Sequence, residues 1–321
     1  MYPGYITDVE GIKVGHASSQ EAMTGCTVVI CEEGASGGVD VRGSAPGTRE
    51  TDLFKAEKMV DRVHAVVLAG GSAFGLEAAS GVMDYLEERK VGFDVGVTRV
   101  PIVASAVIFD LLIGDPKIRP DKAMGYMAAE SASTEERSQG CVGCGTGASV
   151  GKILGPESSM KSGLGSATVR AGDLVVSALI TVNSFGDVFH KGVQIAGVYD
   201  YTTDQLISTE RIMKESTDKI QFANTNTTIG VVATNALLTK AEGNKVAQTA
   251  HNGLARSINP VHTAVDGDTI FVMGTSKVQA DLNLVAMLAA EAVEKAVINA
   301  VMTAKPYGNM KTAGEISEKV L

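Results

Sequence analysis

The order of strand-like and helix-like segments limits the fold of this chain more than any other feature. Helical patterns are expected over residues 72–89, 120–131, 244–258 and 282–302. Strand-like apolar runs are expected over residues 26–32, 64–69, 227–234 and 268–274, with two more strands within 168–188 around a turn at 183–186. The two kinds of segment do not alternate as regular βαβ units. The order therefore favours a layered α+β or sandwich fold over a doubly wound parallel sheet.

Size and charge narrow the class of protein and its partners. With 321 residues, 45% of them hydrophobic, the chain can bury the core of one large domain or of two ordinary ones. A net charge of −9 without a Lys/Arg cluster argues against nucleic acid and anionic membranes as partners. No apolar run is long enough to span a bilayer, and the first residues do not have a signal-peptide pattern. A cytoplasmic location is therefore expected.

Two segments have the composition of loops. Residues 34–52 are rich in glycine and are expected to form a turn. Residues 200–227 are polar and charged and lie between two apolar blocks. Such a segment is the natural place for an exposed loop, and so for a cut in the chain.

Four cysteines fall into two pairs, Cys26 with Cys31 and Cys141 with Cys144. Together they could form a four-thiolate zinc site. The first pair is loosely spaced within a strand-like run, however, and residues five apart in a strand point to opposite faces. Reduced, partly buried thiols are the preferred interpretation, and no metal or other cofactor is expected.

Several familiar motifs are incomplete. Residues 70–75 (GGSAFG) have a serine where the dinucleotide fingerprint needs its second glycine. Residues 34–38 match GxSxG, but no helical pattern follows them. Residues 145–152 are one residue too long for a phosphate-binding loop. His262 lies four residues before Asp266, which leaves a Ser-His-Asp arrangement open.

Thr227 follows a polar turn, residues 224–226, and begins an apolar strand-like run. A threonine hydroxyl is a poor nucleophile without a base, but the α-amine of a chain that begins with threonine can be that base. A precursor reaches this state when the hydroxyl attacks the preceding carbonyl, here that of Asn226, and the resulting ester is hydrolysed. The turn has the form that this reaction needs, although such turns are common before strands.

Two carboxylates, Asp266 and Asp268, lie on either side of a glycine where the last predicted strand begins. In an extended backbone they would share one face, where they could orient a hydroxyl and hold an ammonium group. The same pattern also fits a polar turn before a strand. Lys152 and Asn183, taken alone, fit a surface lysine and a turn asparagine.

Seven sequence blocks, in order along nearly the whole chain, match one known family. They are ITDVEGIKVGHA, DVRGSAPGTRETD, LAGGSAFGLEAA, VGCGTGASVGK, LVVSALITVNSFGDV, NTTIGVVATNA and HTAVDGD. With them the chain resembles the DmpA/NylC family, the L-aminopeptidase/D-esterase and nylon-oligomer hydrolase group. The resemblance implies an α+β N-terminal-nucleophile hydrolase with a four-layer αββα sandwich. It also implies that this single domain, residues 1–321, cuts itself into a large subunit, 1–226, and a small subunit, 227–321.

The resemblance also assigns the reacting residues. Carried over by motif, Thr227 is the nucleophile and the first residue of the small subunit, and Asn226 is the last residue of the large one. Asp266 and Asp268 match the acidic pair that orients the nucleophile in the nylon-hydrolase branch. The chain resembles that branch more than the aminopeptidase branch, which is similar but has a serine nucleophile and a Ser/Glu pair.

Lys152 and Asn183 match two further active-site positions of the family. Asn183 could donate an amide N–H to the developing oxyanion. Lys152 could place a positive charge near it or lower the pKa of the amine base, and Lys161 is a rival for that position. A family tyrosine that contacts substrate falls near Phe109, where this chain lacks the hydroxyl. The family also often has small or polar residues where Cys141 and Cys144 stand.

The function that the resemblance implies is hydrolysis of peptides or of linear amide oligomers such as 6-aminohexanoate oligomers, through an acyl-enzyme on Thr227. The alternatives are an aminopeptidase/D-esterase of the DmpA type, an acyltransferase similar to ornithine acetyltransferase, and an uncut binding or assembly protein. The resemblance also implies a homo-oligomer, a tetramer or larger. The apolar helix expected over 282–302 lies either in the core or at a subunit contact.

Overall fold

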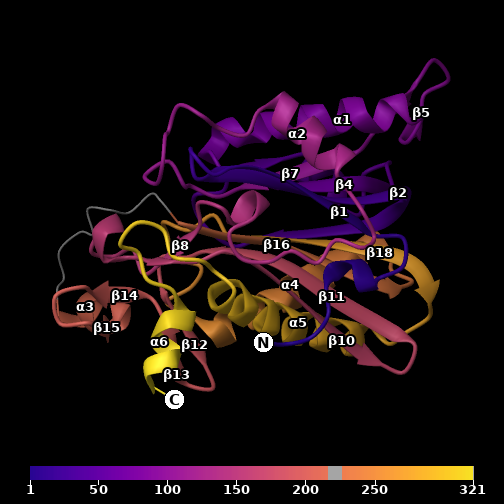
Figure 1. The fold of residues 1–321 in the computed structure, drawn as a ribbon. Coiled ribbons are helices and arrows are strands. Elements are labelled where there is room, and N and C mark those ends of the chain that lie inside the picture. The colour runs from indigo at the N-terminus through magenta and orange to yellow at the C-terminus, as the bar shows by residue number, and fades with distance from the viewer. Residues whose placement is uncertain (216–225, 321) are drawn as a thin grey trace.

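The computed structural model describes residues 1–215 and 226–320. Figure 1 shows two layers of strands between two layers of helices. Helices α1 (Ala78–Glu88) and α2 (Lys122–Glu130) form one outer layer, and α4 (Lys240–Ser257) and α5 (Leu282–Met302) form the other. The expected four-layer αββα sandwich is confirmed.

The strands of both inner layers belong to one hydrogen-bonded sheet, in the order β10-β11-β16-β18-β2-β4-β7-β3, and β1 also pairs with β2. Their bounds are β1 (Lys13–Ser19), β2 (Thr24–Val41), β3 (Thr48–Arg49), β4 (Arg62–Ala69), β7 (Val103–Val107), β10 (Leu164–Ala171), β11 (Leu174–Asn183), β16 (Thr227–Ala236) and β18 (Thr269–Val278). The long strand β2 links the two layers, because residues 26–30 pair with β4 and residues 36–41 pair with β18.

The remaining elements are short. The strands are β5 (Phe93–Asp94), β6 (Arg99–Val100), β8 (Ser149–Val150), β9 (Met160–Lys161), β12 (Asp187–His190), β13 (Val193–Ala196), β14 (Val198–Asp200), β15 (Gln205–Ile207) and β17 (Ile258–Asn259). The helices are α3 (Thr209–Glu215) and α6 (Ala313–Val320).

Apolar cores fill the spaces between the four layers. One lies between α1 and α2 and the layer of β2, β4 and β7, and a second lies between the two strand layers. A third lies between α4 and α5 and the layer of β10, β11, β16 and β18. Strand β16 contributes Ile229 and Val231 to the middle core and Val232 to the core under the helices. Its middle residues, 229–233, form a continuous apolar run, as expected for a strand with both faces buried.

The glycine-rich segment 34–52 is not a turn over its whole length, as the sequence had suggested, because β2 continues to Val41. A Cβ atom on Gly38 would lie 2.1 Å from the main chain of Gly243 in α4. Here glycine allows a helix to approach a strand closely, which is a different use of the residue from turn formation.

Other boundaries also differ from the prediction, since α4 begins at Lys240 and not at residue 244, and β18 continues to Val278 and not only to residue 274. The helix expected from residue 72 begins at Ala78, because Ser72–Glu77 is a 3-10 turn. Within 168–188 the predicted break at 183–186 separates β11 from the short strand β12. The sheet strands β10 and β11 turn instead at Gly172, which has a φ of 57°.

Helix α5 has the predicted bounds and packs against α4, β10 and β11. Its apolar faces are therefore covered mainly by the core of this chain. None of the helices in the described part of the chain is long and apolar enough to cross a membrane.

Candidate active site

Thr227 is the first residue of β16 and lies at the centre of the site. It pairs in register with Asn183, the last residue of β11. The preceding residue, Asn226, forms a bridge to Asp266, and the N–H of Gly267 donates to the carbonyl oxygen of Asn226 at 3.3 Å. The hydroxyl of Thr227 donates to that same carbonyl oxygen. The hydroxyl is thus held against the peptide bond that precedes it.

The Asn226–Thr227 junction is buried, with exposed fractions of 2% and 5%. The predicted exposed loop over 200–227 is therefore wrong at its end, and residues 216–225 lie outside the described residues. Pairing on both sides removes the junction from solvent, and Ala45 also covers the site and donates its N–H to the carbonyl oxygen of Asp266 at 2.9 Å. Both polar atoms of the Asn226 side-chain amide are buried and find no hydrogen-bond partner among the described residues.

Asp266 and Asp268 are both buried, and each has its own partners. One oxygen of Asp268 accepts the N–H of Thr228 at 2.6 Å, and the other lies 2.8 Å from Nδ1 of His262. Asp266 accepts the N–H and the hydroxyl of Thr263 at 2.9 and 2.5 Å. The pair therefore lies beside the Thr227 main chain, but in the turn before β18 and not on one face of an extended strand.

Lys152 and Asn183 contact each other directly. The ammonium of Lys152 donates to Oδ1 of Asn183 at 2.5 Å and to its carbonyl oxygen at 3.1 Å. The N–H of Ser149 also donates to Oδ1 at 3.1 Å, and Nδ2 of Asn183 donates to the carbonyl oxygen of Phe109 at 3.0 Å. Lys152 is 6% exposed and Asn183 is fully buried, so the alternative of a surface lysine and a turn asparagine is wrong.

Burial shifts the pKa values of Lys152 and Asp266 towards neutral pH. It lowers the pKa of Lys152 to about 7, although the charges of Asp266 and Asp110 act in the opposite direction. Burial also raises the pKa of Asp266 to about 6, and the charge of Asp268 adds to that rise. A lysine and a carboxyl group that both change charge near neutral pH are typical of a functional site.

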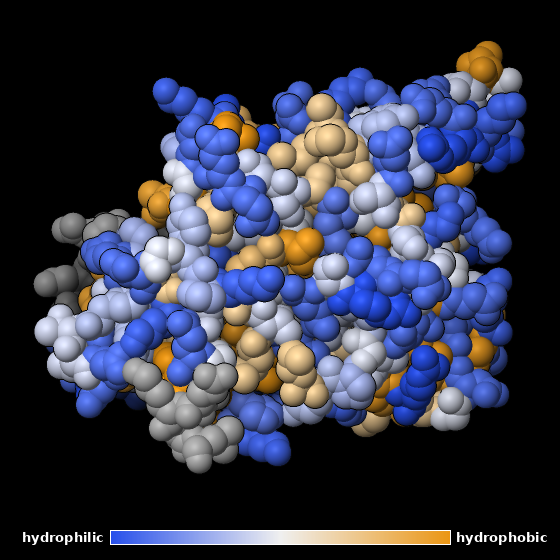
Figure 2. Space-filling view, in the orientation of Figure 1, coloured by the Kyte–Doolittle hydropathy of each residue, from blue (hydrophilic) through white to orange (hydrophobic). Residues whose placement is uncertain are grey.

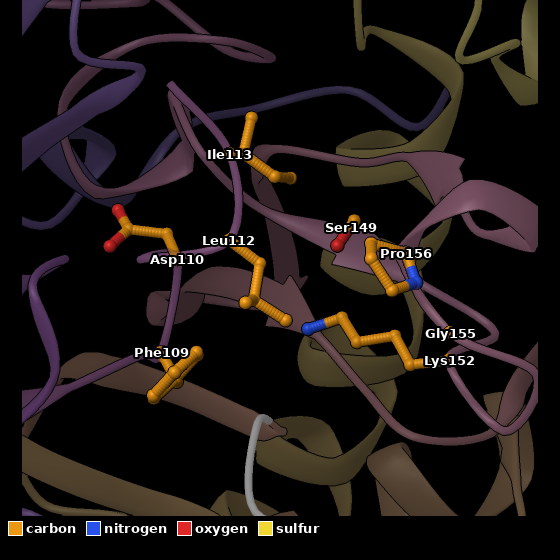
Figure 3. A pocket seen from close by; sticks show the side chains of 8 residues that line it. All are labelled: Phe109, Asp110, Leu112, Ile113, Ser149, Lys152, Gly155 and Pro156. Atoms are coloured by element: carbon orange, nitrogen blue, oxygen red, sulfur yellow. The ribbon is translucent and has the colours of Figure 1, made fainter. Parts of the chain in front are cut away.

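Two pockets meet at Phe109. One is lined by the Asn226–Thr227 junction together with Ala45, Pro46, Gly47, Ser72, Ala73, Val107 and Ile108. The other is drawn in Figure 3, where the side chain of Lys152 extends into the pocket towards Leu112 and Phe109. Phe109 therefore lines both the pocket at the junction and the pocket of the buried lysine.

Some residues of the site were not found from the sequence. No sequence pattern points to Ser149 or Asp110, and the sequence pairs His262 with Asp266, whereas the ring contacts Asp268. The quoted block DVRGSAPGTRETD contains the Ala45 segment, and HTAVDGD contains His262, so both blocks carried a signal. Lys161 donates to carbonyl oxygens of the glycine-rich loop of residues 140–155, at 2.8 Å to Ala148, and thus has a structural role instead.

The cysteines do not gather into one site. Cys26 and Cys31 lie on opposite faces of β2, as expected from their spacing, in the core under α1 and in the middle core. All four cysteines are free thiols. Within residues 1–215 and 226–320, no cluster of three or more His, Cys, Asp or Glu side chains could hold a metal ion.

Comparison with known proteins places the chain in a family. The model of peptidase family S58 matches residues 4–313. An uncharacterized aminopeptidase of Mycobacterium leprae is 42% identical over 295 residues, which cover 86% of this chain and 79% of the relative. A 6-aminohexanoate-oligomer endohydrolase of Paenarthrobacter ureafaciens is 34% identical over 276 residues, which cover 84% of this chain and 75% of the relative.

Solved structures share the fold. The L-aminopeptidase D-Ala-esterase/amidase of Ochrobactrum anthropi, described as a variant of the Ntn-hydrolase fold, matches with a TM-score of 0.74 at 18% identity, over 95% of this chain and 87% of that chain. A β-aminopeptidase of Burkholderia sp. matches with a TM-score of 0.69 at 20% identity, over 96% and 89%. The chain therefore belongs to peptidase family S58, the DmpA/NylC family of amide-bond hydrolases, and has the N-terminal-nucleophile hydrolase fold.

Proposed function

We propose that this amide hydrolase activates itself by cutting the Asn226–Thr227 bond and then uses Thr227 as its nucleophile. The observation that carries the proposal is the contact between the Thr227 hydroxyl and the carbonyl oxygen of Asn226. Strand pairing and the N–H of Gly267 hold that carbonyl in place in a buried site. The bond to be cut and the group that would cut it are thus already adjacent.

The proposed self-cleavage has two steps. The hydroxyl oxygen of Thr227 attacks the carbonyl carbon of Asn226, the C–N bond breaks, and the nitrogen takes up a proton and becomes an α-amine. Water then hydrolyses the ester and releases the carboxylate of Asn226. The products are a large subunit of residues 1–226 and a small subunit of residues 227–321.

In the mature enzyme the new α-amine of Thr227 is the base. It accepts the hydroxyl proton as the oxygen attacks the substrate amide, and it returns a proton to the leaving amine. The acyl group remains on Thr227 as an ester until a water molecule, deprotonated by the same amine, releases it.

The neighbouring side chains have separate roles in this proposal. Asp268 holds the N–H of Thr228 and so fixes the main chain next to the nucleophile. Asp266 supplies negative charge near the α-ammonium. Asn183 turns one of its Nδ2 N–H bonds toward the oxyanion of the substrate, and Lys152 orients Asn183 and adds positive charge when protonated.

The proposed substrates are peptides or linear amide oligomers. The names of the relatives support this class, since they include aminopeptidases and 6-aminohexanoate-oligomer endohydrolases. An aminopeptidase/D-esterase of the DmpA type is the second candidate, because a solved structure of that description shares the fold over most of the chain.

The intact mass of the purified protein under denaturing conditions tests the proposal. Two species are expected, ending at Asn226 and starting at Thr227, whose masses add up to the 33.3 kDa chain plus one water. Thr227→Ala should remain whole and inactive. The control is Thr225→Ala, which changes a threonine two residues earlier in the chain and leaves the proposed nucleophile in place. A Thr227→Ala protein that is cut at the same bond would refute the proposed nucleophile.

The proposal also includes the oligomeric state of the protein and its location in the cell. We expect a homo-oligomer in the cytoplasm. The hairpin of β5 and β6 supports self-association, because Val95 and Val97 are 47% and 94% exposed. A hydrophobic tip is visible in Figure 2 where Figure 1 has β5. The free thiols of the four cysteines suit a reducing compartment.

A further inference from the structure

His262 contacts Asp268 in a way that the proposed mechanism does not use. Its N–H donates to Oδ2 of Asp268 at 3.2 Å, and its Nδ1 lies 2.8 Å from the same oxygen. The other oxygen of Asp268 accepts the N–H of Thr228 at 2.6 Å. His262 therefore binds one oxygen of the buried Asp268 carboxylate. The other oxygen of Asp268 binds the main chain of Thr228, the residue that follows the nucleophile.

The conformation of His262 is itself fixed by its surroundings. Its φ of 55° lies in the left-handed region, which is uncommon for residues other than glycine, although asparagine, aspartate and histidine adopt it more often than the rest. Its ring packs edge-on against the ring of His251 in α4, with 4.8 Å between the ring centroids. A backbone conformation of this kind persists only where neighbouring contacts determine it, and it is often found at functional sites.

We propose that His262 is a positioning residue, which fixes the rotamer of Asp268 and thereby the main chain of Thr228 beside the nucleophile. The inference rests on the proposed function, in which Thr227 attacks first its own chain and then the substrate. Without the imidazole, Oδ2 of Asp268 would keep only the longer contact with the main-chain N–H of His262, and the carboxylate could rotate more freely about its side-chain torsions. With both oxygens held, it keeps Thr228, and so the Thr227 hydroxyl, in the reactive geometry.

The geometry separates this role from that of a catalytic base. Nδ1 of His262 is directed at Asp268, and its Nε2 is buried without a hydrogen-bond partner among the described residues. The ring is thus placed to support the carboxylate. The effect of removing it should therefore appear in the rate of the reaction and not in the binding of substrate.

Two substitutions separate the side-chain contact from the backbone conformation. Glycine and asparagine both tolerate a positive φ, but only asparagine carries an N–H close to the place of the imidazole Nδ1. We expect His262→Gly to slow self-cleavage and to lower kcat by about 10- to 100-fold with little change in KM, as a displaced reactive group does. We expect His262→Asn to restore most of both rates.

Matched variants keep the test decisive. His262→Gln retains a donor at the position of Nε2 and should be as slow as His262→Gly, which covers the case in which the glycine variant does not fold. Lys191→Gly is the control for glycine at a positive φ, since Lys191 has a φ of 51° in an exposed turn. It should cleave and turn over like the unchanged protein. The melting temperature of each variant shows that it is folded.

The outcomes also separate this inference from the proposed function. If His262→Gly matures and turns over normally, or if His262→Asn is as slow as His262→Gly, the positioning role is refuted while the nucleophile assignment stands. If Thr227→Ala still cuts itself, the proposed function fails, and the inference fails with it.

Discussion

At the scale of the residue, Lys152 should make the stability of the uncut chain depend on pH. Its pKa of about 7 in the folded chain lies below the ordinary value of 10.5, because burial disfavours the ammonium. Between these two values the unfolded chain holds a proton that the folded chain has released. The free energy of unfolding should therefore rise with pH from about 7 upward, by at most about 1.4 kcal/mol per pH unit.

This prediction is best tested in the Thr227→Ala background, in which the chain should remain whole. Urea unfolding at pH 7, 8 and 9 should show the increase, and a further Lys152→Met substitution should remove it, since methionine does not titrate. Other titrating groups are the same in both proteins, so the difference between the two slopes isolates the lysine. Equal slopes would contradict a titrating lysine at this site.

The sequence indicates which residues lie together in the candidate site, but it does not indicate which atoms of these residues contact one another. Thr227, Lys152, Asn183, Asp266 and Asp268 were named from the family resemblance, and the structure brings them to one buried region. The pairing of Lys152 with Asn183 joins residues 31 apart in the chain. Such contacts are set by how β11 and the glycine-rich loop meet in the fold, which neither local spacing nor hydrophobic period encodes.

At the scale of the element, the contact between α4 and α5 depends on Gly253. A Cβ atom on this residue would lie 2.3 Å from the carbonyl oxygen of Ala290 and 2.8 Å from the main-chain nitrogen of Glu294, both in α5. Those atoms are main chain and can only move if the helices separate. The gap between the two helices is therefore set by the absence of a side chain.

Gly253→Ala should lower the free energy of unfolding by about 1–3 kcal/mol, because overpacking outweighs the better helix propensity of alanine. Gly314→Ala is the matched control. In α6 the nearest neighbours of an added Cβ lie at 3.6 and 3.8 Å, which is ordinary contact. That variant should be neutral or more stable by up to about 1 kcal/mol. Denaturant unfolding of both in the Thr227→Ala background measures this, and the same sign for both would contradict the argument.

The type of an element was predicted correctly from apolar runs and incorrectly from glycine content. The apolar runs of β4 and β16 predicted strands because they are short and rich in valine, and the run of α5 predicted a helix because it is too long for a strand. The type of α2 was also as predicted. Glycine predicts a turn over residues 34–52 because it is common in turns, yet the part up to Val41 is strand, and Gly38 there is needed for the approach of α4. A sequence shows that a glycine is present, but only the fold shows which neighbour requires it.

At the scale of the whole molecule, the proposed cut lies inside the central sheet. Strands β16 and β18 would belong to the proposed small subunit, and they pair with β11 and β2, which would belong to the proposed large one. Helix α5 packs on β10 and β11. The two fragments would therefore share one core and one sheet, and they should stay together until the protein unfolds.

The melting temperature of the mature protein should consequently depend on concentration. Unfolding of the cut protein releases two chains, so a tenfold dilution shifts the balance towards the unfolded state by about 1.4 kcal/mol. The uncut Thr227→Ala protein unfolds to one chain and lacks this contribution.

Any concentration dependence that the two proteins share comes from assembly of whole copies, so the excess in the mature protein is the quantity to measure. Calorimetry over a hundredfold range of concentration should show this excess. A different outcome is a mature protein that is fully cut by mass and yet has the same concentration dependence of the melting temperature as Thr227→Ala. Its fragments would then remain associated after the heat transition, contrary to the shared-core argument.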